Sequence, residues 1–308
     1  MTSRDAALGR FRRLDLTVQR RLDGLLHGDH QGFRLGPGDD PEELVRYQPG
    51  HDVRRIDQHV TARAREPYVW LTRAQHPLDS WVLLDRSASM AFGTAADEKG
   101  DLAQSLSAAV GLLTDAPGNR FGIVELTTDG LRWRRPTPPR VGAQLALRTP
   151  ASPRSGSAPV GLAEALRQLS VRHRRPGLRI VVSDLVDPDG RTEQPFDWEA
   201  PLRRLAARHE VIMIEIVDPR ELQLPEVGLL VLVDPESGRQ REVDSSDLRL
   251  RHAYARAAVA HRQATAAAVA GAGVDHLLVR TDGDWVAELS RFVQLRRHRP
   301  ARRRRRTR

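Results

Sequence analysis

Three oxygen-bearing side chains stand two residues apart where an apolar run ends. The run Trp81–Leu84 is followed by Asp85-Arg86-Ser87-Ala88-Ser89. An apolar run of this length is typical of a buried strand, so we expect Asp85, Ser87 and Ser89 on the exposed loop at its end. Carboxylate and hydroxyl oxygens are the ligands of a hard cation such as Mg²⁺. Serine and aspartate are also ordinary turn and helix-cap residues, so the motif needs support from other segments.

The Asp-x-Ser-x-Ser motif resembles the metal-ion-dependent adhesion site of von Willebrand factor A-type domains. The resemblance implies a divalent cation with one coordination position left for an acidic side chain of a partner protein. Two later segments look like the family's other ligand loops: Ser155-Gly156-Ser157 stands for its Gly-Gly-Thr loop, and Ile180–Asp184 for its strand that ends in aspartate. The ligands implied are Asp85, Ser87, Ser89, Ser157 and Asp184. The expected ion is magnesium, with manganese and calcium as alternatives.

From Trp81 onward, strand patterns alternate with helical patterns, which predicts an α/β fold with a doubly wound, mainly parallel sheet. The predicted strands are residues 81–84, 121–126, 178–183, 211–217 and 274–279. The turn Thr128-Asp129-Gly130 leads into Leu131–Trp133, which we expect as one antiparallel edge strand, as in a von Willebrand A-type domain. The ligand loops would then converge at the sheet edge where the strand order reverses.

Three further elements follow from local signals. Leu229–Val233 and Gln240–Val243 predict an inserted β-hairpin, and Ser245-Ser246-Asp247 predicts the start of a long alanine-rich helix that ends near Gly271–Gly273. The segment Arg140–Ser157, rich in Pro, Gly and Arg, is expected to be a loop that leads into the site.

A second motif precedes the α/β pattern. From Val45 the chain reads Val-Arg-Tyr-Gln-Pro-Gly-His-Asp-Val-Arg-Arg-Ile-Asp, followed by Thr61-Ala62-Arg63. It resembles the signature Arg-x-Tyr-x-Pro-Gly-Asp-Asp-x-Arg-x-Ile-Asp-Trp-x-x-Ser-Ala-Arg of the bacterial domain-of-unknown-function-58 family, whose members carry a von Willebrand A-type domain directly downstream. The chain departs from it at Val45, His51, Gln58 and Thr61, which replace arginine, aspartate, tryptophan and serine.

The cluster that carries this signature could form a structural ion-pair network or bind a partner directly, and both interpretations stay open. Its members are Tyr47, Pro49, Gly50, Asp52, Arg54, Arg55, Asp57 and Arg63.

The charge of the chain is unevenly distributed. Of 308 residues, 49 are basic and 40 acidic, and the 9 arginines of residues 296–308 account for the whole excess of +9. We expect residues 1–79 to carry the signature and pack on the main domain, 80–295 to form the von Willebrand A-type domain, and 296–308 to be a disordered basic tail. The tail could touch nucleic acid or an anionic surface, but the body has no matching basic patch. There is no cysteine, which excludes disulfides and thiolate metal sites.

The leading interpretation is a metal-dependent protein-interaction module and not an enzyme. The family resemblance implies an adaptor for a MoxR-type AAA+ ATPase in the assembly or maturation of other proteins. The competing interpretation is an aspartyl-phosphate-type magnesium enzyme with Asp85 as nucleophile. Such an enzyme needs a second carboxylate and a lysine close by, whereas Ser87 follows Asp85 and the only lysine, Lys99, lies further along the chain.

No segment approaches the roughly 18 uninterrupted apolar residues of a membrane helix, and no signal-peptide pattern follows Met1. We therefore expect a cytoplasmic protein without a membrane span, a short soluble form of the family.

Overall fold

The computed structural model describes residues 9–18, 43–49, 53–71, 77–94, 98–148, 160–186, 193–233 and 238–297. The predicted ligand Ser157, the signature residues Gly50 and Asp52, and the tail from residue 298 lie outside these ranges.

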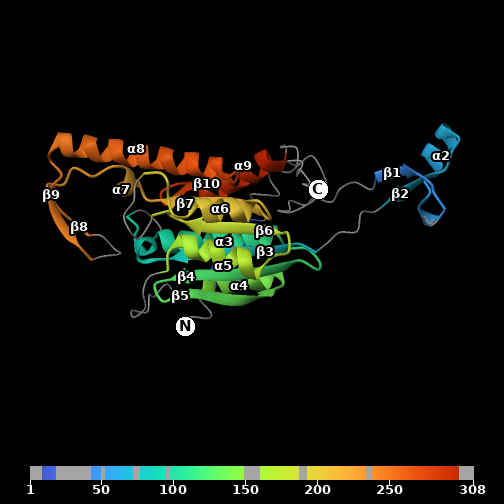
Figure 1. Cartoon of the computed structure of the whole chain (residues 1–308), viewed down its shortest axis with the longest axis horizontal. Helices are drawn as coiled ribbons and strands as arrows, with labels where there is room; N and C mark the ends of the chain where they lie inside the picture. The colour runs from blue at the N-terminus through green and yellow to red at the C-terminus, as the bar shows by residue number, and fades with distance from the viewer. Residues whose placement is uncertain are drawn as a thin grey trace.

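The main domain is built on a six-stranded sheet in the order β10-β7-β6-β3-β4-β5 (Figure 1). The strands are β3 (Asp79–Arg86), β4 (Arg120–Thr127), β5 (Gly130–Thr137), β6 (Leu178–Ser183), β7 (Glu210–Val217) and β10 (Asp275–Arg280). Every neighbouring pair is parallel except β4 and β5, which are antiparallel. The chain adds β4 and β5 on one side of β3 and then β6 on the other, so the strand order reverses between β3 and β6. The predicted doubly wound sheet with one antiparallel edge strand is confirmed.

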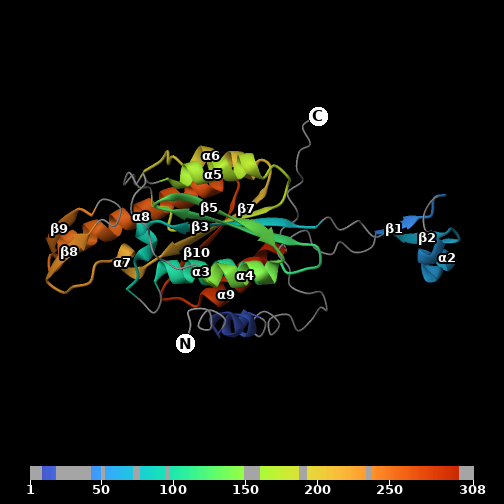
Figure 2. The same cartoon turned by 90° about the horizontal axis from the view of Figure 1, so that it is seen from below.

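Helices cover both faces of this sheet (Figure 2). One face is covered by α3 (Lys99–Leu113), α4 (Pro139–Arg148) and α9 (Trp285–Arg297). The other is covered by α5 (Leu162–Arg172), α6 (Glu199–Ala206) and the C-terminal half of α8 (Leu248–Gly271). In β3, Val82 and Leu84 belong to the first core, and Trp81 and Leu83 to the second. Because both faces are buried, the central strands appear in the sequence as unbroken apolar runs.

The predicted loop over Arg140–Ser157 is wrong in its first part, which forms α4. The helix packs on the core mainly through small residues, because Gly142, Ala143 and Ala146 face it together with Leu147. A Cβ placed on Gly111 of α3 would lie 3.0 Å from the Cβ of Ala143, which shows how closely the two helices approach. The buried residues of α4 recur at helical spacing, so the pattern was present in the sequence. The Pro, Gly and Arg content of the whole segment was instead taken as the sign of a loop.

A helix at residues 9–18 packs on the layer of α3, α4 and α9 (Figure 2). Its Phe11 and Val18 are buried in the same core as Val82. Arg10 lies 3.4 Å from Asp101 of α3, and Asp15 is paired with Arg140 of α4. This helix therefore packs on the main domain.

The described residues of the signature belong to a small unit of their own. Strand β1 (Glu43–Arg46) pairs antiparallel with β2 (Tyr68–Leu71), and η1 (Val53–Arg55) and α2 (Gln58–Ala64) lie between them in the chain. In Figures 1 and 2 this unit is set apart from the main domain. Its packing on that domain stays a prediction.

The segment between β7 and β10 projects from one end of the sheet. It comprises α7 (Pro219–Leu222), the antiparallel strands β8 (Leu229–Val233) and β9 (Gln240–Asp244), and α8. The predicted hairpin is therefore confirmed. The side chain of Asp247 caps α8 by accepting the backbone N–H of Arg249 at 2.8 Å, as expected for an N-cap aspartate.

Candidate metal centre

Asp85 is the next-to-last residue of β3 and is only 4% exposed. The expectation that it lies on an exposed loop is wrong, because β3 stays paired with β4 through Arg86. Its Oδ1 accepts the backbone N–H of Ser87 at 2.9 Å, and its Oδ2 accepts the hydroxyl of Ser183 at 2.5 Å. These two bonds orient the carboxylate at the sheet edge.

The two predicted hydroxyl ligands lie together beyond this carboxylate. After β3 the chain turns into η2 (Ala88–Ala91), which brings the Oγ atoms of Ser87 and Ser89 to 3.0 Å from each other. Adjacent ligands of an octahedral Mg²⁺ ion, with metal–oxygen distances near 2.1 Å, are also about 3.0 Å apart. Calcium, with distances of about 2.3–2.6 Å, would hold adjacent ligands about 3.3–3.7 Å apart. In this structure the two hydroxyls share a hydrogen bond at 3.0 Å. Oxygen-only donors of this kind are the ligands that a hard divalent cation, magnesium or calcium, takes.

Asp184 follows β6, the strand beside β3, and its position depends on a tight backbone turn. Leu185 is buried and has φ 57°, in the left-handed region that side chains such as leucine seldom adopt. Its N–H donates to the Ser183 hydroxyl at 3.0 Å, and the N–H of Val186 donates to Asp184 Oδ1 at 3.2 Å. This turn places Asp184 close enough to Asp85 for their charges to repel each other.

Ser183 was missed by the sequence analysis. It is 1% exposed and joins the ends of β3 and β6 by donating its hydroxyl proton to Asp85. The only local signal was a hydroxyl directly before Asp184 at the end of a strand, and that signal does not specify its partner 98 residues away.

Lys99 is the second missed residue. It begins α3, its side chain is 1% exposed, and its Nζ lies 2.7 Å from Asp184 Oδ2 and 2.5 Å from Glu221 Oε1 of α7. Burial disfavours the charged amine, but the two carboxylates outweigh burial and raise the pKa of Lys99. A single lysine among 49 basic residues was the signal that could have pointed to it. The sequence-based argument that a lysine is lacking near Asp85 is corrected by this contact with Asp184.

Two effects disfavour the charged form of Asp85. Burial, and next the negative charge of Asp184, raise the pKa of Asp85 to about 6. A divalent ion next to Asp85 would oppose both effects. Among the described residues, no three His, Asp or Glu side chains are grouped so that they could hold a metal.

Ser157 lies outside the described residues, but the chain that follows it reaches the same edge. A Cβ placed on Gly130 would lie 3.8 Å from Val160 Cγ2. Gly130 begins β5 directly after the carboxyl end of β4, and β4 runs parallel to β3. Helix α5 therefore begins near the edge that carries Asp85, as the prediction for Ser157 requires.

Two residues of the signature have structural roles within the small unit. Asp57 caps α2 by accepting the N–H groups of His59 and Val60, both at 2.9 Å. The hydroxyl of Thr61 accepts the N–H of Tyr68 at 3.0 Å, a role that the family's serine could also fill. The ion-pair network and the direct partner-binding role proposed for the signature cluster both stay predictions.

Known proteins resemble this chain at the level of sequence and of fold. The proteins Rv1480 of Mycobacterium tuberculosis and Mb1516 of Mycobacterium bovis, both described as uncharacterized, are each 46% identical over 294 residues, which cover 93% of this chain and 89% of theirs. The crystal structure of BatB from Bacteroides thetaiotaomicron aligns over 71% of this chain and 98% of its own, with 14% identity and a TM-score of 0.42. A von Willebrand factor type A protein from Catenulispora acidiphila aligns over 74% of this chain and 43% of its own, with 13% identity and a TM-score of 0.34.

No helix within the described ranges is long and apolar enough to cross a membrane. The sequence matches the family described as "Protein of unknown function DUF58" over residues 43–264. The matched stretch holds both the signature unit and most of the sheet, and the chain belongs to the DUF58 family.

Proposed function

We propose that this chain is a protein-interaction module that binds its partner through a divalent cation, with magnesium as the preferred ion. The cation is held by Asp85, Ser87 and Ser89, together with Ser157 and Asp184. The observation that supports this proposal is the pair of hydroxyls 3.0 Å apart beside a buried carboxylate. They lie where the strand order reverses, which is the usual ligand site of open α/β sheets.

The partner presents an aspartate or glutamate on a protruding loop. A cation held mostly by hydroxyls stays electrophilic enough to take a further carboxylate. Asp184 shares its negative charge with Lys99, so it neutralises the cation less than a free carboxylate would. The family resemblance suggests a MoxR-type AAA+ ATPase as this partner, with the chain as an adaptor in assembly or maturation of other proteins.

Isothermal titration with magnesium and with manganese tests the metal site. The wild-type chain is expected to bind one ion, and Asp85→Ala to bind none. The matched control is Asp282→Ala, which removes an exposed carboxylate that is paired with Arg280 beyond the carboxyl end of β10, and it should bind like the wild type. Equal binding by wild type and Asp85→Ala would contradict the site.

A second candidate function is an aspartyl-phosphate enzyme, and one observation favours it. Lys99 and Asp184 supply the lysine and the second carboxylate that such a site needs. We rank it second because Asp85 is buried, and a phosphate donor needs more room beside the attacking carboxylate oxygen than a single ion does. Incubation with acetyl phosphate and magnesium, followed by mass spectrometry, separates the two functions. A phosphoryl group on Asp85, with release of acetate, would favour the enzyme.

A further inference from the structure

The β8–β9 hairpin exposes an apolar strip on one of its faces. Residues paired across an antiparallel ladder point to the same side of the ribbon. Leu229, Val231 and Val233 are 73%, 56% and 54% exposed. Strand β8 contains neither a charged residue nor proline, although exposed edge strands commonly carry them to prevent unwanted pairing. An unprotected apolar strand of this kind is typical of an interaction surface.

The same face also carries negative charge. The partners of the three apolar residues across the ladder are Asp244, Glu242 and Gln240, and all three are exposed. We call these six residues the outer face of the hairpin: Leu229, Val231, Val233, Gln240, Glu242 and Asp244. None of its members is basic. On the opposite face, Leu230, Leu232 and Val243 are half-buried, and Arg241, which pairs with Leu232, is exposed.

The hairpin is fastened at its base. The hydroxyl of Ser245, which is fully buried, donates to the carbonyl of Gly228 at 2.7 Å and accepts the N–H of Val227 at 3.0 Å. Arg251 of α8 donates to the Ser245 carbonyl at 2.5 Å and lies 3.0 Å from Glu226. These contacts hold both strands at the start of α8, so the outer face is formed before a partner arrives. A preformed surface loses less conformational entropy on binding.

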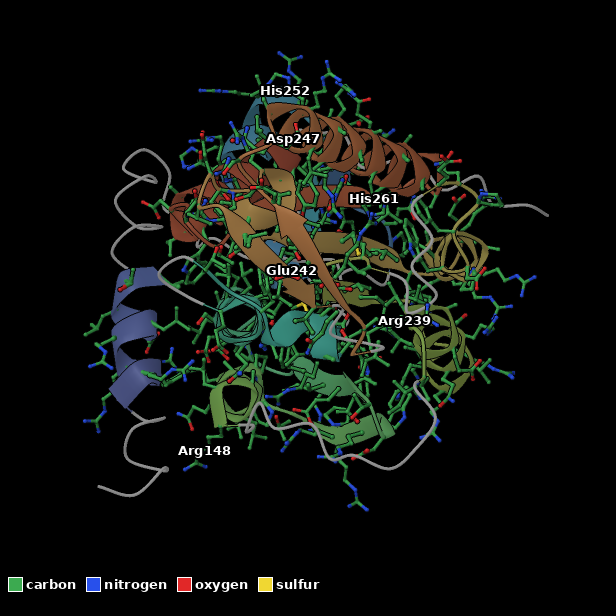
Figure 3. All side chains as sticks on the ribbon, turned by 90° about the vertical axis from the view of Figure 1, so that its left-hand side faces the viewer. Arg148, Arg239, Glu242, Asp247, His252 and His261 are labelled. Atoms are coloured by element: carbon green, nitrogen blue, oxygen red, sulfur yellow. The ribbon has the colours of Figure 1, made fainter. Side chains whose placement is uncertain are left out.

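The outer face lies at the same end of the molecule as the candidate metal centre. Asp218, at the end of β7, accepts the backbone N–H of Thr94 at 2.9 Å, just after η2. Glu221 of α7 is paired with Lys99. In Figures 1 and 2 the hairpin projects from the end where η2 and α7 lie, and Figure 3 looks onto this end, with Glu242 labelled on the hairpin.

We propose that the outer face is a second docking surface, for a partner segment that carries aliphatic side chains beside arginine or lysine. The aliphatic groups would cover Leu229, Val231 and Val233, and the basic groups would meet Glu242 and Asp244. Complementary charge of this kind sets specificity and speeds association. The proposal rests on the proposed function in one respect, because it assigns both surfaces to one protein partner.

Two synthetic peptides of equal length test the charge preference. Both contain valine and serine at the same positions and differ only in carrying arginine or glutamate, and both have blocked termini. In EDTA, which keeps the glutamate peptide from binding through a metal ion, fluorescence anisotropy is expected to show the arginine peptide binding the wild-type chain at least ten-fold more tightly than the glutamate peptide. Val231→Ser should weaken that binding at least ten-fold, whereas Val171→Ser, at an exposed valine of α5, should leave it unchanged.

A charge reversal supplies the second arm. Glu242→Arg should weaken binding of the arginine peptide and strengthen binding of the glutamate peptide. The control Glu210→Arg makes the same change of charge at the other end of the sheet, where β7 begins, and should leave the preference as in wild type. Binding of the arginine peptide should persist in EDTA. If the chain turned out to bind no metal ion, this result would therefore stay the same.

Three results would overturn the proposal. Equal affinity for the two peptides in EDTA, where the glutamate peptide cannot bind through a metal ion, would rule out the charge complementarity. Loss of arginine-peptide binding in EDTA would show that this peptide binds at the metal centre and not at the outer face. Concentration-dependent dimerisation in sedimentation, abolished by Val231→Ser, would assign the outer face to a second copy of this chain.

Discussion

At the scale of single residues, the candidate centre combines three buried charged groups, Asp85, Asp184 and Lys99. Their net charge would change on binding a proton or a divalent cation. Asp85 and Asp184 lie at the ends of adjacent parallel strands. Lys99 neutralises only part of their negative charge, because it also donates a hydrogen bond to Glu221. Burying like charges is costly unless they are paired. The centre should therefore respond to pH and to divalent cations.

The stability of the chelated protein should depend on the protonation of Asp85. Its pKa is about 6 in the folded chain and 3.8 in its ordinary state, so the folded chain holds this proton more strongly than the unfolded chain. The contribution of Asp85 to stability is therefore fully present below about pH 4 and is lost as pH rises to about 6. Asp85→Asn should be more stable than wild type at pH 7, by up to about 3 kcal/mol.

Urea unfolding of both proteins in EDTA across this pH range measures the effect. The decisive quantity is the difference in unfolding free energy between Asp85→Asn and wild type, because other titrating groups cancel in it. A difference that stays constant with pH would show that the folded state does not raise the pKa of Asp85.

Lys99→Met should strongly destabilise the chelated protein. It leaves Asp184 and Glu221 without their buried cation, and removing one partner of a buried pair typically costs about 3–5 kcal/mol. Magnesium should restore part of this loss if the ion approaches Asp184. The control Arg10→Met breaks a half-exposed ion pair with Asp101, which lies on α3 as Lys99 does. This substitution should lower the free energy of unfolding by less than about 1 kcal/mol. Equal losses in thermal melts would refute the role of Lys99 as counter-ion.

At the scale of elements, β3 is the strand on which both the core and the candidate centre depend. It pairs with β4 and β6, and its apolar side chains enter the cores on both faces. Val82→Asp would place an unpaired charge at a fully buried position and should unfold the main domain. Val171→Asp, at a position that is 62% exposed, should leave circular dichroism and melting nearly unchanged. A folded Val82→Asp protein would contradict the position of β3 in the sheet.

At the scale of the whole molecule, binding of the partner should depend on the metal more than on the basic tail. The 9 arginines of residues 296–308 account for the net charge, and their field is screened beyond about 8 Å at physiological salt. In pull-downs with a purified MoxR-type ATPase, EDTA or Asp184→Ala should reduce binding far more than deletion of residues 302–308. Binding that survives EDTA but is lost on tail deletion would indicate a charge-driven binder instead.

The sequence by itself determined the elements whose signals are local. Strands buried on both faces appear as apolar runs, so β3, β4, β6 and β7 could be placed, and the edge strand and the hairpin followed from their turns. The grouping of Ser87 and Ser89 could also be expected, because their spacing lies within one turn of the chain. The helical spacing of the buried residues in α4 was also present in the sequence, but the Pro, Gly and Arg content of that segment was taken as the sign of a loop.

Only the tertiary structure decided the surroundings of the carboxylates. Ser183 bonds to Asp85 across 98 residues and Lys99 to Asp184 across 85. Such contacts depend on which strands become neighbours, and many strand orders are compatible with the same apolar pattern. The burial of Asp85 likewise follows from how far β3 stays paired with β4, which depends on both strands together. Local sequence determines the types of the ligands, whereas the sheet topology determines their charge environment.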